Sequence, residues 1–165
     1  MHGGWNLCYS QTYDKGMAGS ITDILIQCTG SKLMLGCRKR NSPNISLLAW
    51  APTDDVIFQT QDKNPSHIAN SVKWYFDQQK GVNCFPKTCS WGFARSNDTI
   101  DRNNCDINGM NSPFRLCWHT AYSSGGYRCG NNTNLEDNQE WEKLIFRHGM
   151  DRYIIFSVKL FWGAF

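Results

Sequence analysis

Short apolar runs alternate with turn-forming residues along most of the chain. Turn signals such as "NSPN" at 41 and "SSGG" at 123 recur at short intervals, and strand-like apolar runs fill the segments between them. Two runs, "KLMLGCRK" and "ISLLAWA", are almost continuously apolar, as expected of strands buried on both faces. The pattern predicts strands over residues 4–10, 22–28, 32–37, 46–50, 55–60, 71–76, 90–95, 114–120, 126–129 and 153–160.

Two segments favour helices instead. In "TNLEDNQEWEKLIFRHG", Asn134 can cap a helix and Gly149 can end it, while apolar residues recur between them at helical spacing. We predict a helix over 135–148, with a strand at "WEKLIF" as the alternative. A second helix is indicated over 66–79, where apolar side chains again share one side.

These patterns together predict a single domain of mainly β structure. The 165 residues suit one hydrophobic core, and we find no internal repeat or linker. We expect a disulfide-stapled sandwich or irregular barrel with one or two short helices over residues 1–150. Residues 151–165 form an apolar tail in which "YIIFSVKL" alternates like a strand, so the tail is a candidate extra strand.

The cysteines indicate disulfides and an oxidising compartment. Their even number in a β-rich chain favours a disulfide framework, and the tight ligand pairs typical of structural zinc sites do not occur. We expect local pairs Cys84–Cys89 and Cys28–Cys37, and a secreted or extracellular protein, although the opening "MHGGWNLCYS" shows no signal-peptide pattern. The eight residues are Cys8, Cys28, Cys37, Cys84, Cys89, Cys105, Cys117 and Cys129.

Charge gives little guidance to partners. The net charge is +3 and both signs are interspersed, so we expect no nucleic-acid partner, which would need a broader basic stripe. The one dense basic run, Arg38 to Arg40, is interpreted as a solvated loop, with an anion-binding patch as the alternative. No apolar run is long enough for a transmembrane helix.

Three N-glycosylation sequons lie in predicted loops. They begin at Asn44, Asn97 and Asn131, in polar contexts where a glycan could be accommodated. Such three-residue patterns also arise by chance in an Asn-rich chain, so each is a candidate site only.

Aromatic residues beside polar groups suggest a recognition surface. The chain holds seven Trp, nine Phe and six Tyr, and "VKWYFD", "SWGFAR" and "RLCWHT" each place a tryptophan next to charged or hydrogen-bonding residues. Stacking on such rings is a common way to hold a sugar. The alternative is that each tryptophan packs in the core. The candidate ligand-binding residues are Trp74, Trp91, Arg95, Trp118 and His119.

The segment "CSWGFARSNDTIDRNNCDINGMN" also contains the outline of a calcium loop. Oxygen-bearing side chains surround Gly109, but the closing Glu of a complete loop signature is missing. A disulfide-anchored turn explains the same residues. The candidate calcium ligands are Asp101, Asn103, Asp106 and Asn108, and we expect no other cofactor.

The sequence favours a binding module over an enzyme. No established catalytic motif occurs. We expect recognition of a glycan or a cell-surface protein, with two alternatives: an adhesive protein acting by protein contact, or a secreted hydrolase. The oligomeric state stays open. A hydrolase would use His67 or His119 as acid or base with Asp54, Asp55 or Asp106.

The opening "GGWNLCYS" resembles the glycine-tryptophan opening of fibrinogen-like lectin domains over these few residues. No residue role is carried over from this resemblance.

Overall fold

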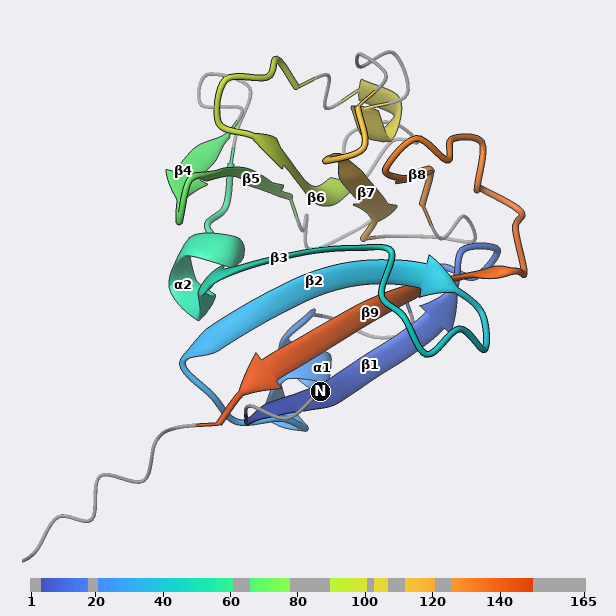
Figure 1. Cartoon of the computed structure of the whole chain (residues 1–165). Coiled ribbons are helices and arrows are strands. Elements are labelled where there is room, and N and C mark those ends of the chain that lie inside the picture. The colour runs from blue at the N-terminus through green and yellow to red at the C-terminus, as the bar shows by residue number, and fades with distance from the viewer. Residues whose placement is uncertain are drawn as a thin grey trace, which may run out of the picture.

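A computed structural model describes residues 4–17, 21–60, 66–77, 90–100, 103–106, 112–120 and 126–149. Its described part is mainly β, with two open sheets and two short α-helices (Figure 1), which confirms the predicted fold class in its sandwich form. The tail at 151–165, the strand predicted at 153–160, and both Cys84 and Cys89 lie outside the described residues.

The first sheet has four antiparallel strands in the order β1-β9-β2-β3. Its edge strands come early in the chain, and one of its two central strands is the last described element, so the sheet joins the two ends of the described chain (Figure 1). The four strands are β1 (Trp5–Thr12), β2 (Lys32–Lys39), β3 (Leu47–Pro52) and β9 (Trp141–His148).

The second sheet is a meander in which each strand pairs with the next along the chain, in the order β4-β5-β6-β7-β8. Such pairing needs only hairpin connections between neighbours. Its strands are β4 (His67–Ala69), β5 (Val72–Phe76), β6 (Ser90–Arg95), β7 (Leu116–His119) and β8 (Arg128–Cys129).

The two sheets together confirm seven of the strands predicted from the sequence. These are the strands predicted at 4–10, 32–37, 46–50, 71–76, 90–95, 114–120 and 126–129.

The helix predicted over 135–148 is wrong, and the alternative of a strand at "WEKLIF" is confirmed, because β9 occupies residues 141–148. The strand lies between β1 and β2, and three consecutive residues, Lys143, Leu144 and Ile145, are buried, so its side chains do not alternate between buried and exposed. The polar residues before it form turns: the Asn138 side-chain oxygen accepts hydrogen bonds from the backbone N–H groups of Glu140 and Trp141. Asn138, and not the predicted cap Asn134, makes these side-chain bonds, and they close a turn before the strand.

The helix predicted over 66–79 is also wrong. A hairpin of β4 and β5 occupies this segment, joined at Asn70 and Ser71. Both turn residues have positive φ, at 50° and 59°, as a tight two-residue hairpin turn requires.

Two predicted strands are short helices. Residues 22–28 contain α1 (Ile21–Ile26), which buries Ile21 and Ile24, one helical turn apart. The strand predicted over 55–60 is also wrong: α2 (Thr53–Val56) follows β3 directly and buries its own Val56, and residues 57–60 lie in no strand. In both cases a short apolar run gave no reliable period, so helix and strand could not be told apart.

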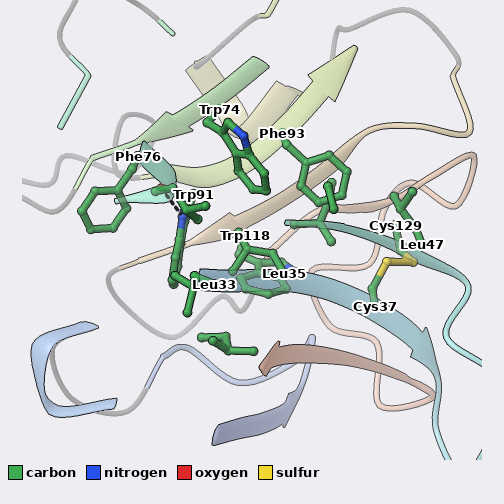
Figure 2. Close-up of a cluster of buried hydrophobic side chains, with 14 of the residues drawn as sticks. Leu33, Leu35, Cys37, Leu47, Trp74, Phe76, Trp91, Phe93, Trp118 and Cys129 are labelled. Atoms are coloured by element: carbon green, nitrogen blue, oxygen red, sulfur yellow. Dashed lines mark hydrogen bonds between the residues drawn. A yellow bond between two sulfur atoms is a disulfide. The ribbon is translucent and has the colours of Figure 1, made fainter. Parts of the chain in front are cut away.

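The core lies between the two sheets. Leu33 and Leu35 of β2 meet the tryptophan-rich inner face of the second sheet (Figure 2). The Trp91 and Trp118 rings meet edge to face, with centroids 5.8 Å apart. The Trp118 indole N–H donates to the Tyr13 hydroxyl at 3.0 Å, and that hydroxyl donates onward to a backbone carbonyl of β8 at 3.0 Å. The Trp118 indole and the Tyr13 hydroxyl therefore both have hydrogen-bond partners in the core.

Three disulfides staple the described residues. Cys8–Cys28 holds the segment after α1 against β1, and Cys37–Cys129 joins β2 of the first sheet to β8 of the second (Figure 2). The Cys28–Cys37 pair predicted from sequence is wrong, because Cys37 points into the core toward the opposite sheet. The third bridge is Cys105–Cys117. These bridges are typical of a protein from an oxidising compartment.

Arg147 of β9 fixes the chain after α1. Its guanidinium donates to the backbone carbonyls of Leu25 and Cys28, at 3.2 and 3.0 Å, and also to the carbonyl of Gly30. These acceptors lie at and after the C-terminal end of the helix, where carbonyls lack partners within the helix. None of the described helices is long and apolar enough to cross a membrane.

Candidate ligand pocket and the predicted site residues

The three tryptophans predicted to bind a ligand are core residues. Trp74, Trp91 and Trp118 are 1%, 0% and 0% exposed. The indole N–H of Trp74 donates to the Ala69 carbonyl and that of Trp91 to the Val56 carbonyl, each at 3.1 Å. Their rings have no face open to solvent. These three tryptophans therefore pack in the core, which was the alternative interpretation of the sequence.

Arg95 and His119, the other two predicted ligand-binding residues, lie on different strands and do not form one surface with these rings. Arg95 ends β6 on the surface, where its guanidinium carbon stacks 4.1 Å from the Phe114 ring centre. His119 ends β7 and is half-buried opposite Ser90.

Asp106, predicted as a calcium ligand, is the anion of a buried arginine cluster. Its carboxylate oxygens lie 2.7 and 2.6 Å from Nη1 of Arg115, and 3.4 Å separates one oxygen from Nη1 of Arg128. All three side chains are buried. A buried carboxylate with two cationic neighbours is not available as a metal ligand in this arrangement.

Asn103 begins the 3-10 helix η1 (Asn103–Asp106), while Asp101 and Asn108, like the side chain of Asn103, lie outside the described residues. In the described part of the chain, no group of three or more His, Cys, Asp or Glu side chains is arranged to hold a metal ion.

This arginine cluster explains part of the segment "CSWGFARSNDTIDRNNCDINGMN", which covers residues 89–111. The Cys105–Cys117 bridge ties η1 to β7, and Cys105, Cys117 and Tyr75 form a small second hydrophobic cluster. Arg115 also lies 3.4 Å from the Asp98 carboxylate and donates to the Thr99 carbonyl. The described part of the segment is therefore a disulfide-anchored loop that covers the outer face of the second sheet.

The structure brings together one of the acid–base pairs considered for a hydrolase. Nε2 of His67 lies 2.7 Å from Oδ1 of Asp55, and the Phe58 ring stacks on the imidazole with centroids 4.7 Å apart. Asp54 is exposed on α2. Both members of the pair are about one-third exposed, and neither lines the pocket described below. The pair joins α2 to β4.

The basic run at 38–40 lies mainly on a strand. Arg38 and Lys39 end β2, and the Arg38 guanidinium pairs with Glu142 of the neighbouring strand at 2.8 Å. Lys39 lies 3.8 Å from Glu140. Ion pairs thus engage Arg38 and Lys39, two of the three basic residues.

A polar pocket with a volume of about 380 Å³ opens beside β8. This volume lies within the range of roughly 300–1000 Å³ that is typical of small-molecule sites. We call it the Tyr127 pocket, and its lining residues are Tyr127, Asn134, Glu136, Asp137 and Asn138.

Backbone hydrogen bonds hold the wall of this pocket. Leu135 is buried and its N–H donates to the Tyr127 carbonyl at 3.1 Å, while the Asn138 N–H donates to the Leu135 carbonyl at 2.9 Å. The Asn138 carbonyl accepts from the Asp14 N–H at 3.1 Å, which ties the wall to the segment after β1. The pocket is therefore formed before any ligand arrives, which reduces the entropy cost of binding.

The pocket side chains combine one aromatic ring with several hydrogen-bonding groups. The Tyr127 hydroxyl bonds to the Asn134 side-chain oxygen, and Asn134 has a φ of 58°, a left-handed conformation that asparagine tolerates. The carboxylates of Glu136 and Asp137 are exposed and can accept hydrogen bonds from hydroxyl or amine groups. Their charge disfavours anionic ligands.

Sequence reasoning missed this pocket because its residues are ordinary loop residues. The sequence pattern places "NLEDN" at the start of a predicted helix, and it gives no signal for Tyr127 as a site residue. The available signal was the aromatic residue of "GGYRCG" followed by a run of Asn, Glu and Asp. Only the hairpin fold brings the two together.

The three sequon asparagines, Asn44, Asn97 and Asn131, are all exposed and lie outside the strands. Each position has room for an attached glycan.

Comparison with known proteins adds no relative. No protein-family model matches the chain, and no match was found among curated proteins or among solved structures.

Proposed function

We propose that this protein is an extracellular recognition module that binds a carbohydrate in the Tyr127 pocket. The observation that carries the proposal is the composition of the pocket: one aromatic ring, two side-chain amides and two carboxylates around a cavity of about 380 Å³. Sugar rings present both an apolar face and many hydroxyl groups, and this set of side chains can meet both.

The pocket chemistry restricts the class of sugar. Glu136 and Asp137 place two negative charges at the rim, with no arginine or lysine among the lining residues. Sialylated and sulfated sugars would meet unfavourable electrostatics. We expect neutral or amine-bearing sugars to be preferred.

The extracellular setting is supported by the disulfides. Three bridges among the described residues are typical of secreted proteins, and the three exposed sequons are suited to N-linked glycans in the same compartment. A protein made in a secretory host should carry glycans that an N-glycosidase removes.

A glycan array with two variants tests the proposed function. Asn134→Gly removes the pocket amide while suiting the left-handed backbone, and Asp137→Ala removes one rim carboxylate. Asp54→Ala, an exposed carboxylate on α2, is the matched control. We expect neutral sugars to bind the wild type and the control, with at least about tenfold weaker binding to the two pocket variants.

Two results would contradict the proposal. One is the absence of binding across a broad array, with or without calcium. The other is binding that the two pocket variants retain in full, because the sugar would then be held elsewhere.

A further inference from the structure

The first sheet presents an apolar outer face. Along β3, Leu47, Ala49 and Ala51 point into the core, so Leu48 and Trp50 point outward. The cross-strand register places outward apolar residues of the other three strands beside them. We call this surface the outer face, and its apolar members are Trp5, Leu7, Met34, Leu48, Trp50 and Phe146.

Two tryptophans reach toward each other over this face from opposite edge strands. Trp5 lies on β1 and Trp50 on β3, yet their ring centroids are 6.2 Å apart. Trp5 also meets His148 edge-on at 5.2 Å, and the Lys32 ammonium lies 5.1 Å from the Trp50 ring. Met34, the cross-strand partner of Trp50, is only 3% exposed. The rings thus form a cover over the central strands.

Large apolar side chains remain exposed around this cover. Leu7, Leu48 and Trp50 are 51%, 42% and 36% exposed. The second sheet differs, since its outer face is covered by the loop that carries η1 and the Arg115 cluster. An apolar patch with a polar rim on one side of a sheet is typical of a contact surface.

We infer that the outer face is a contact surface for a second copy of this chain. Charged and polar groups stand at the two ends of the face: Lys32 and His148 at one end, and Glu142 paired with Arg38 at the other. A two-fold axis across the strands would place Lys32 of each copy near Glu142 of the other. The centre of the face carries no charged side chain in the described strands, so it can be desolvated without leaving a buried charge.

The size of the face indicates a reversible dimer. Three strands of eight residues and one of six, spaced about 4.8 Å apart, give the outer face an area of roughly 500 Å² in each copy. Stable complexes bury about 800 Å² per partner, so this contact lies at the small end. We expect exchange between monomer and dimer over micromolar concentrations.

Sedimentation velocity on the full chain from a secretory host, between about 1 and 300 µM, tests this inference. Leu48→Thr and Trp50→Thr keep strand-forming residues while removing apolar surface from the face. Ile68→Thr is the matched control, since Ile68 is 57% exposed on β4 of the other sheet. Circular dichroism checks that each variant is folded.

The wild type and Ile68→Thr should approach the mass of a dimer as concentration rises. Leu48→Thr and Trp50→Thr should shift the midpoint at least about tenfold higher, and Lys32→Glu should also weaken association. A monomer at every concentration would overturn the inference. Association that the two face variants leave intact would also overturn it, because another part of the chain would then form the contact. Glycan binding is measured separately at the Tyr127 pocket, so failure of one proposal leaves the other standing.

Discussion

Lys143 is expected to make the stability of this protein depend on pH. The lysine lies on β9 with 0% exposure, and its ammonium donates to the Lys15 carbonyl at 2.5 Å. Burial lowers the pKa of Lys143 from its usual 10.5 to about 7, partly offset by the nearby Asp14 carboxylate. The unfolded chain therefore binds a proton that the native protein releases, so stability rises with pH above 7.

The size of this effect follows from the two pKa values. A native pKa of about 7 and an unfolded value near 10.5 give a rise in unfolding free energy of about 2 kcal/mol between pH 6.5 and 8.5. Urea denaturation at fixed ionic strength, with disulfides intact, measures this rise. Lys143→Met keeps most of the side-chain stem but has no titrating group, so the variant should lose most of the rise.

Lys39→Met is the matched control, because Lys39 is on the same sheet but 65% exposed. That variant should keep the wild-type pH dependence. If wild type and Lys143→Met show the same slope between pH 6.5 and 8.5, the buried lysine does not titrate as argued, and its ammonium must be better solvated or better paired.

Two further predictions concern the elements that hold the fold together. Replacing Cys37 and Cys129 by alanine should lower the free energy of unfolding by about 4–5 kcal/mol, because that bridge spans 92 residues. Replacing Cys8 and Cys28, which are 20 residues apart, should lower it by about 3 kcal/mol. Urea denaturation of both variants checks this order, and a reversed order would contradict the entropic argument. Asp106→Asn should cost about 3–5 kcal/mol, because two buried arginines lose their counter-charge. A loss below about 1 kcal/mol in the same assay would mean that the cluster is solvated.

Strand content was largely predictable from sequence, and the misassigned elements share one physical cause. In β9, Trp141, Leu144 and Ile145 fit a helical period, but the strand is central in its sheet and buries adjacent residues, so it does not alternate. α1 shows the reverse case, since its six residues are too few to establish a period. Contacts with distant parts of the chain decided the structure of β9 and of α1, and a local sequence pattern does not contain that information.

The candidate site was less predictable, because exposure depends on which sheet face a residue occupies. The sequence could not separate Trp91 and Trp118, which fill the core, from Trp5 and Trp50, which lie on the outer face. The same limit applied to Asp106, where only the fold brings in Arg115 and Arg128. By contrast, the even cysteine count was enough to predict the presence of disulfides, although not their pairing.

The most direct test of the proposed function is a ¹H–¹⁵N correlation titration of the full chain with single sugars. The panel would contain mannose, galactose, N-acetylglucosamine, glucosamine and sialic acid. Binding at the Tyr127 pocket predicts saturable shifts at Tyr127 and residues 134–138 with one or more of the neutral or amine-bearing sugars, and none there with sialic acid. Shifts confined to another surface, or no shifts with any sugar, would contradict carbohydrate recognition at this pocket.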